Sequence, residues 1–434
     1  MLGRRNKVGS RKFLELGLAI LFLFAPILAF SGGGQGEKAP AEKQVLIYNS
    51  NWSDEQYRVA DSQVVSMFQA QNPNVKIIHS VISDEDFKQA IRAYLQAKPG
   101  PDVLTWYAGN RARFFIGKGL ILDISDVYKQ EGWYNKFSEA FVNLSTMNGK
   151  QYFVPTNWYW WAVFYRKSVF QKLALSTPKT WDEFMTVCEK IKQSGMSPIT
   201  IGTKWSWTTG GWFDYLNMRL NGADFHLSLC DGEQSYTDPR VKKVFTDYWG
   251  PLVKKGYFIP DASAYSWQEA INLMVTGKAA MYLMGQFIAT AWPKEIIDDL
   301  DFFQFPIIDP KVPIAEDAPT DGVFASTNAA NPEVAKKFLA FLGSAPAQQV
   351  WVQKLGRLAT HNDVDQSLYS PYQKKGIALI KTAKMLTQFY DRDTTPPMAE
   401  RGMDSFMEFW ANPDDLDSIM ARLDDQRKEF FGKK

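Results

Sequence analysis

Alternating strand-like and helix-like segments open the globular part of the sequence, and they constrain the fold more than any other feature. Residues 44–52, 75–82 and 102–107 are apolar segments of strand length. The two segments between them, 54–71 and 84–97, carry apolar residues at helical spacing. Strands that alternate with helices pair in parallel and are covered by those helices. The sequence therefore predicts an α/β fold with a mostly parallel sheet that is flanked by helices.

Length and charge limit the classes of protein to which the chain can belong. It has 434 residues, of which 45% are apolar and 22% are charged. This balance is typical of a globular protein, and the length predicts two or three domains. The formal net charge is +2, but residues 1–31 hold five basic residues and one acidic residue, so the remainder carries a small negative charge. A nucleic acid is not expected as a partner, because phosphate binding requires a concentrated positive face.

The first 31 residues predict export from the cytoplasm. A basic segment precedes an apolar run over residues 16–30, which is shorter than the roughly 20 residues of a membrane-spanning helix. Ala29 and Ser31 are the small residues that signal peptidase requires. We expect 1–31 to be a cleaved signal peptide and 32–43 a flexible tether, with an uncleaved membrane anchor as the alternative. No cysteine follows the apolar run, so the expected location is periplasmic or otherwise extracytoplasmic without a lipid anchor.

Histidine and cysteine are too few to suggest metal chemistry. The chain has three histidines and two cysteines, far apart in the sequence, so neither a metal site nor a cofactor is expected. Cys188 and Cys230 are two buried thiols or, alternatively, a disulfide formed in an oxidising compartment. The position of Cys188 on the inner face of a predicted helix favours buried thiols. No nucleophile elbow, HExxH motif or phosphate loop is present, so no catalytic residue is predicted.

Four segments, in this order, carry a resemblance to a known family: 101–126 (PDVLTWYAGNRARFFIGKGLILDISD), 148–184 (which begins NGKQYFVPTNWYWWAVFYRK and ends PKTWDEF), 276–287 (TGKAAMYLMGQF) and 321–351 (which begins DGVFASTNAANPEVAKKF). Together they resemble the extracellular solute-binding proteins of ABC importers, in the carbohydrate-binding family that includes maltose-binding protein. The matching segments are spread over most of the chain after residue 43.

The resemblance implies a periplasmic-binding-protein fold of two lobes, each a mostly parallel sheet flanked by helices, joined by a hinge of several strands. We expect the first lobe to comprise residues 44–155 and 285–327, and the second to comprise 156–284 and a helical part, 328–434. The chain is then expected to cross between the lobes near residues 150–160, 280–287 and 320–330.

Aromatic residues indicate the chemistry of the site. The chain has 15 Trp, 18 Tyr and 30 Phe, more than a core of this size obviously needs. An aromatic face matches the C–H patches of a sugar, while nearby carboxylates and amides bind its hydroxyls. Some candidates follow predicted strands, where α/β sheets bind ligands, some lie in the aromatic crossing segment or around a Gly-rich turn, and the last three lie in segments of the family resemblance. The candidate ligand-binding residues are Trp52, Trp106, Asn157, Trp158, Trp207, Trp212, Asp214, Gln286, Phe287 and Asp321. The alternative for each Trp is a place in the core or at the domain seam.

The predicted function is a binding protein, expected to be a monomer, that captures a mono- or oligosaccharide between two closing lobes and delivers it to a membrane ABC permease. One alternative is a secreted carbohydrate-cleaving enzyme, for which Asp391 with Asp393, or residues 84–86, would supply paired carboxylates. Ser83 before Asp86 favours a helix cap instead. Another alternative is the same fold with a polyamine, peptide or metal as its ligand. Neither the sugar nor its length can be predicted from the residues.

Overall fold

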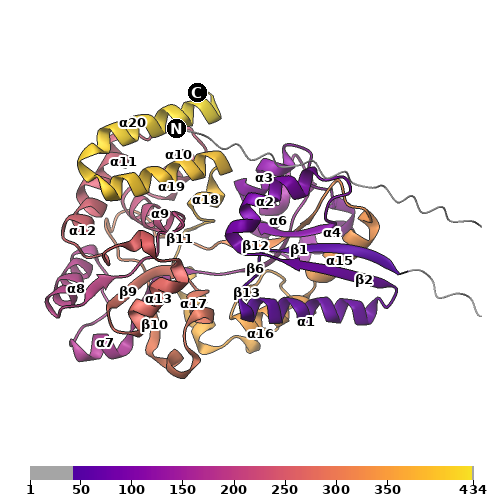
Figure 1. Ribbon diagram of the computed structural model, residues 1–434, viewed down its shortest axis with the longest axis horizontal. Coiled ribbons are helices and arrows are strands. Elements are labelled where there is room, and N and C mark those ends of the chain that lie inside the picture. Colours follow the sequence, from indigo (N-terminus) through magenta and orange to yellow (C-terminus); the bar gives the residue numbers. More distant parts are fainter. Residues whose placement is uncertain (1–42, 433–434) are drawn as a thin grey trace, which may run out of the picture. The chain divides into compact units, whose positions relative to one another are not determined.

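Two mixed sheets organise the part of the chain that the computed structural model describes, residues 43–432 (Figure 1). The predicted signal peptide, 1–31, and nearly all of the predicted tether, 32–43, lie outside these residues. Between residues 43 and 432, no helix combines the length and the apolar character that crossing a membrane requires.

The first sheet has six strands. Their order across the sheet is β13 (Leu358–Ala359), β6 (Val154–Trp158), β12 (Thr320–Ala325), β3 (Val103–Tyr107), β1 (Gln44–Ser50) and β2 (Val75–Val81). β1 is parallel to both β2 and β3, whereas β12 is antiparallel to β3 and β6, and β13 is antiparallel to β6. The strands predicted at the start of the chain are therefore parallel neighbours, as expected.

Helices cover both faces of this sheet (Figure 1). Side chains alternate between the faces along each strand: Val323 of β12 packs with α1 (Glu55–Gln71), α15 (Pro332–Leu342) and α16 (Ala345–Leu355). Phe324, the next residue, faces α2 (Asp84–Gln96) and α3 (Asn110–Ile116). We call this sheet with its helices the first lobe. It also contains α4 (Ser125–Glu131), α5 (Trp133–Lys136), α6 (Glu139–Ser145), β4 (Thr146–Met147) and β5 (Lys150–Gln151).

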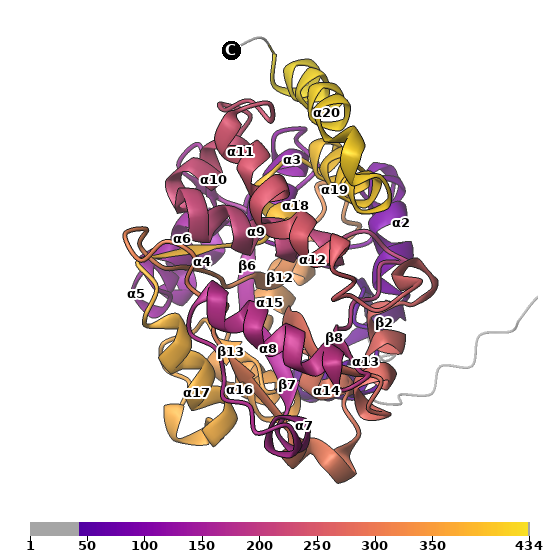
Figure 2. The ribbon, with the colours of Figure 1, turned by 90° about the vertical axis from the view of Figure 1, so that its left-hand side faces the viewer.

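The second sheet has four strands, in the order β10 (Leu300–Phe303), β7 (Trp161–Arg166), β9 (Ala279–Gly285) and β8 (Ser197–Ile199). Only β7 runs against the others. α8 (Trp181–Gln193), α9 (Thr208–Asn221) and α13 (Trp267–Val275) pack against it, and Figure 2 shows α8 in front of the strands. We call this sheet with the elements around it the second lobe.

The remaining elements of the second lobe are mainly helical. They are α7 (Lys167–Lys172), α10 (Ala223–Cys230), α11 (Pro239–Lys243), a π-helical turn (Val244–Trp249), α12 (Gly250–Lys254), α14 (Ile288–Ala291), α17 (Pro371–Ile380), α18 (Tyr390–Asp393), α19 (Pro396–Ala411), α20 (Leu416–Phe431) and the strand pair β11 (Ala315–Asp317) and β14 (Met385–Thr387). Cys188 and Cys230 are both free and buried there, so the interpretation as buried thiols is confirmed, and burial raises the pKa of each thiol.

The chain crosses between the two sheets from β6 to β7, from β11 to β12, and again after β13. No crossing occurs at 280–287, where one was predicted, because β9 and β10 both pair with β7. The segment 285–303 therefore stays with the second lobe.

The expected boundary at residue 328 also needs correction. α15 and α16 were predicted to belong to the second lobe, but their apolar faces pack in the first. Phe338 contacts the ring of Tyr48 on β1, and Trp351 contacts the ring of Trp52 just beyond it. β13 then extends the first sheet, so the C-terminal part of the second lobe begins only after residue 359.

Candidate ligand-binding site

A cavity of about 240 Å³ lies where the carboxyl ends of β1 and β3 face the second lobe. The first lobe contributes Asn51, Trp52, Ser53, Asp54, Tyr57, Ser83, Asp84, Glu85, Tyr107, Asp321 and Arg357. The second lobe contributes Trp205, Trp267, Gln268, Phe287 and Arg392, and the crossing segment contributes Tyr159. Parallel strands end together at one edge of a sheet, and ligands of open α/β sheets bind at that edge. We call this space the inner cavity.

A hydrogen-bonded group of side chains holds the strand ends in place. The Asn51 side chain donates to Asp84 Oδ1 at 2.6 Å and to Tyr107 Oη at 2.9 Å. The Thr105 hydroxyl donates to Asn51 Oδ1 at 2.7 Å and accepts from the Asn51 backbone N–H at 2.9 Å. Each of these polar groups is paired, as buried polar groups generally are, so the network orients the wall of the cavity.

Asp84 reaches the cavity because it is the first residue of α2. The Ser83 hydroxyl accepts the backbone N–H of Asp86 at 3.2 Å and so caps the helix, as the sequence predicted. Burial alone would raise the pKa of Asp84, but Lys88, whose Nζ lies 2.8 Å from Asp84 Oδ2, and the donors Tyr107 and Asn51 outweigh burial and lower it. Asp84 is therefore an ionised acceptor at the rim of the cavity.

Two arginines converge on Asp321 of β12. Arg392 Nη1, from α18 of the second lobe, lies 2.9 Å from Asp321 Oδ1, and Arg357 Nη2, from the first lobe, lies 3.6 Å from Oδ2. Arg392 also donates to the Tyr159 hydroxyl at 2.8 Å. Burial alone would lower the pKa of Arg392, but Tyr159 and the neighbouring acids Asp321 and Asp391 raise it. This charged group therefore joins both lobes and the crossing segment at the floor of the cavity.

Aromatic rings form the walls between these charged groups. The Arg357 guanidinium lies 3.9 Å from the ring centroid of Tyr159, and Phe287 contacts the rings of Tyr159 and Trp267 at centroid distances of 5.5 and 5.1 Å. Arg357 also donates to the Tyr57 hydroxyl at 2.5 Å. Burial raises the pKa of Tyr57 to about 12, so its hydroxyl is neutral. Aromatic faces that alternate with charged donors and acceptors suit a ligand with both apolar and hydroxyl surfaces.

Three of the predicted site residues lie at this cavity. Trp52, Phe287 and Asp321 line it. Trp106 and Trp207 instead line a neighbouring cavity of about 570 Å³, and Trp106 is 2% exposed, with its ring covered by Phe87, Phe115 and Arg111. Contact between Trp207 and a ligand stays a prediction. The packing around Trp106 leaves no free face of its ring on which a sugar could stack.

Asn157, Trp158 and Gln286 do not line the inner cavity. The Trp158 indole N–H donates to the Ala359 carbonyl at 2.9 Å, so the Trp158 side chain adds a hydrogen bond between β6 and β13. Gln286 is 1% exposed and donates to the Leu355 carbonyl at 3.0 Å, and Asn157 is 2% exposed within β6. Asn157 and Trp158 lie at the end of β6, where the chain crosses to β7, and the Gln286 backbone N–H donates to the Trp160 carbonyl in that crossing at 2.9 Å.

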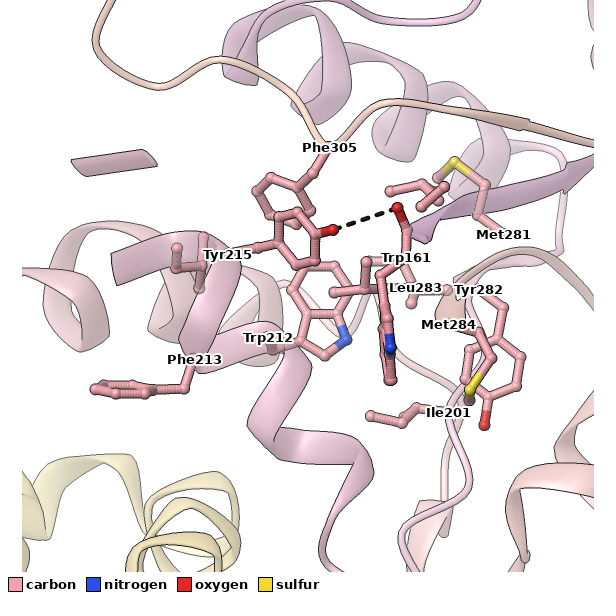
Figure 3. Packing of buried hydrophobic residues seen from close by; sticks show 14 of the residues in the cluster. Trp161, Ile201, Trp212, Phe213, Tyr215, Met281, Tyr282, Leu283, Met284 and Phe305 are labelled. Carbon is pink, nitrogen blue, oxygen red and sulfur yellow. Dashed lines mark hydrogen bonds between the residues drawn. The ribbon is translucent and has the colours of Figure 1, made fainter. Parts of the chain in front are cut away.

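Trp212 and Asp214, on α9, were predicted in the site and lie in the core of the second lobe instead. Figure 3 shows Trp212 among Phe305, Tyr215 and Trp161, whose carbonyl accepts the Tyr215 hydroxyl at 3.3 Å. Trp212 is 1% exposed. Both faces of α9 are buried, including its polar residues Asp214 and Asn217, so polar residues on this helix do not mark a cavity wall.

Asp214 has an unusual environment for a buried carboxylate. It accepts the backbone N–H of Tyr390 at 2.7 Å, and its other oxygen lies 3.3 Å from His226 Nε2. Burial first, then the negative charges of Asp393 and Asp391, raise the pKa of Asp214 well above 3.8, and burial lowers the pKa of His226. The neutral acid is therefore the form that the fold favours.

We expect Asp214→Asn to change the pH dependence of stability. The folded protein keeps a proton that the unfolded chain loses above pH 3.8, the ordinary pKa of an Asp side chain. The contribution of this group to stability therefore falls as the pH rises from about 4 towards the folded-state pKa. Asn cannot ionise, so the variant's melting temperature relative to wild type should be higher at pH 8 than at pH 5. The exposed Asp247→Asn should show no such trend. An equal difference at both pH values would contradict the prediction.

Several residues that line the cavity were not among the predicted ligand-binding residues, namely Asn51, Asp84, Tyr107, Tyr159, Trp267, Arg357 and Arg392. Asn51 and Tyr107 are the second-last and the last residue of predicted strands, so the rule that selected Trp52 at a strand end also points to them. Arg392 lies between two acids that were considered as a carboxylate pair. In the structure Asp391 pairs with Arg111, and Asp393 accepts the backbone N–H groups of Gln388 and Phe389. Within residues 43–432, no cluster of three or more His, Cys, Asp or Glu is placed to hold a metal ion.

The sequence profile described as bacterial extracellular solute-binding protein matches residues 49–349. The chain belongs to this family. The match confirms the resemblance, and it identifies the chain as a binding protein and not as a carbohydrate-cleaving enzyme. It also agrees with an extracellular or periplasmic location.

Individual relatives agree with the family match. An uncharacterized ABC transporter extracellular-binding protein of Pyrococcus horikoshii is 27% identical over 397 residues, 86% of each chain. The alpha-glucosides-binding periplasmic protein AglE of Rhizobium meliloti is 25% identical over 322 residues, 69% of each chain. The solved structure of the bacterial solute receptor AcbH, described as having an exclusive substrate preference for β-D-galactopyranose, superposes with a TM-score of 0.84. It is 32% identical and is matched over 90% of this chain and 100% of its own.

The maltose-bound MalE3 of T. maritima has a TM-score of 0.75 at 15% identity, with 89% of this chain and 100% of that chain covered. At this identity the likeness concerns the fold alone. Together the solved structures confirm the predicted two-lobed periplasmic-binding-protein fold.

Proposed function

We propose that this solute-binding protein captures a saccharide in the inner cavity and delivers it to a membrane ABC permease. One observation carries the proposal: a cavity between the lobes has aromatic walls and a charged floor in which Asp321 is held by one arginine from each lobe. Carboxylates and guanidinium groups bind neighbouring hydroxyls, and the rings of Trp267 and Phe287 supply faces for C–H groups.

The size of the inner cavity supports a single sugar ring at this position. A volume of about 240 Å³ corresponds to about eight water molecules at roughly 30 Å³ each, which suits one hexopyranose ring. The relatives whose names mention β-D-galactopyranose and alpha-glucosides support the same class of ligand.

The polyamine alternative is disfavoured by the two arginines. Arg357 and Arg392 both line the inner cavity, and their charges oppose the entry of a second cation. A polyamine site would instead combine its aromatic rings with an excess of free carboxylates. In this cavity Asp321 pairs with both arginines, and Asp84 and Glu85 pair with Lys88, so Asp54 is the one lining carboxylate that forms no ion pair within the described residues.

We also propose how the protein is exported to the extracytoplasmic space. Residues 1–31 would direct export and be removed, and the exported monomer would meet the permease subunits at the membrane. N-terminal sequencing of the exported protein, with Gly32 as the expected first residue, tests the cleavage.

Binding is tested by thermal denaturation of the exported protein with galactose, glucose, maltose or spermidine. A ligand that binds only the folded state stabilises it by about 2.7 kcal/mol at a concentration of 100 Kd. We expect at least one of the saccharides to raise the melting temperature in a saturable manner, and spermidine to have no effect. Stabilisation by spermidine alone would contradict the proposal.

A further inference from the structure

A second cavity of about 570 Å³ adjoins the inner cavity, and the two share Glu85 and Trp205 in their walls. We call it the outer compartment. Its first wall is the α2 face that carries Lys88 and Arg92, and its second wall is the α19 face that carries Glu400 and Asp404. Like the inner cavity, it lies between the lobes.

Lys88 and Trp205 stand at the junction of the two spaces. Lys88 Nζ lies 5.9 Å from the ring centroid of Tyr107, in the inner cavity, and 5.9 Å from that of Trp207, in the outer compartment. The same Nζ pairs with Asp84 and with Glu85. Trp205 is 45% exposed, an unusual state for so large a ring. The junction therefore offers a free aromatic face beside polar groups.

Among the described residues, three charged side chains of the outer compartment form no ion pair, whereas Lys88 pairs with Glu85 and Arg111 pairs with Asp391. Within residues 43–432, Arg92 forms no ion pair on the α2 wall, and Glu400 and Asp404 form none on the α19 wall. Asp404 lies one helical turn after Glu400, so these acids share a face of α19. Donors on one wall and acceptors on the other suit the ring of hydroxyls that a sugar carries.

The volume of the inner cavity suits one ring, so a longer ligand would extend beyond it, and the outer compartment adjoins it at Glu85 and Trp205. We propose that the outer compartment is a second sugar subsite and that the ligand is a disaccharide or longer saccharide. In this arrangement the terminal ring occupies the inner cavity, and the next ring lies between Arg92 and Asp404, beside Trp205. This inference rests on the proposed function of the inner cavity.

Calorimetric titration of matched sugars tests the subsite. Galactose is compared with melibiose, in which it is linked to a second ring, and glucose is compared with maltose. We expect one disaccharide to bind at least tenfold more tightly than its monosaccharide. Trp205→Ala should lower the affinity for that disaccharide by about 5- to 150-fold, the range for loss of an aromatic anchor. Its exposure means that the fold should be retained.

Two further variants separate the compartments. Arg92 lines the outer compartment and not the inner cavity. Arg92→Gln should therefore lower the affinity for the disaccharide and leave the affinity for the monosaccharide unchanged. Tyr134→Ala, which removes a comparably exposed ring (48%) on α5, should change neither affinity.

Three outcomes would overturn the inference. If the monosaccharides bind as tightly as the disaccharides, or if Arg92→Gln affects both equally, the subsite is rejected and the proposed function stands. If no saccharide binds, both are rejected.

Discussion

Replacing Asp321 with Asn is expected to lower the free energy of unfolding by about 3–5 kcal/mol, the loss typical when one partner of a buried ion pair is removed. Asp321 is 6% exposed, and the two arginines that it pairs with are 3% and 7% exposed. Within the described residues, no other carboxylate forms an ion pair with Arg357 or Arg392. The variant therefore removes the one carboxylate that is paired with these two buried guanidinium groups.

Urea unfolding of the variant and the wild type measures this loss. Glu408→Gln is the matched control, because its pair with Arg422 has side chains that are 44% and 52% exposed. An exposed pair contributes about 0–1 kcal/mol. The double variant Asp321→Asn with Arg392→Gln should be less destabilised than the sum of the single variants, because the two residues interact directly. Additive losses would show that Asp321 does not stabilise the fold through Arg392.

The same substitution should also weaken sugar binding, if the proposed function is correct. Arg392 extends from the second lobe to a strand of the first, so the Asp321 pair positions groups from both lobes at the floor of the inner cavity. Binding that is unchanged in a folded Asp321→Asn protein would place the sugar elsewhere in the cleft.

Local patterns in the sequence predict the elements of the fold well. Phe87, Ile91 and Leu95 repeat every fourth residue and are the buried face of α2, and Ser83 caps it. The same patterns do not show which sheet a helix covers. α15 has a buried apolar face formed by residues such as Val334 and Phe338, but an apolar face is complementary to either lobe. The assignment of α15 depends on contacts with Tyr48 and Phe68, which are far away in the sequence.

The site was harder to predict because it consists of strand ends and single residues from distant segments. The rule that ligands lie beyond the carboxyl ends of parallel strands placed Trp52 at the cavity. It placed Trp106 at the outer compartment and not at the inner cavity, because the last two residues of a strand point to opposite faces. Tyr107 is the one that faces the cavity. Arg357 and Arg392 precede and follow α17, and no local pattern indicates that both turn towards Asp321.

Trp212 and Trp267 are expected to respond to truncation in opposite ways. Trp212 contacts the rings of Phe258 and Phe305 at centroid distances of 5.1 and 5.8 Å in the core of the second lobe. Trp212→Ala should therefore lower the free energy of unfolding by about 3–5 kcal/mol. Because Trp212 does not line the inner cavity, the affinity of the protein that remains folded should be unchanged.

Trp267 begins α13, where Ser266 and Glu269 form a capping box that positions the ring at the cavity wall. The ring is half-buried and contacts Phe287. Trp267→Ala should weaken binding of the sugar found by screening by about 1–3 kcal/mol, which is about 5- to 150-fold in affinity. Its free energy of unfolding should fall by less than that of Trp212→Ala. Urea unfolding and calorimetric titration of both variants test the contrast. If Trp267→Ala keeps full affinity while Trp212→Ala loses it, the sugar site is not the inner cavity, and the aromatic residues of α9 must be reconsidered as its wall.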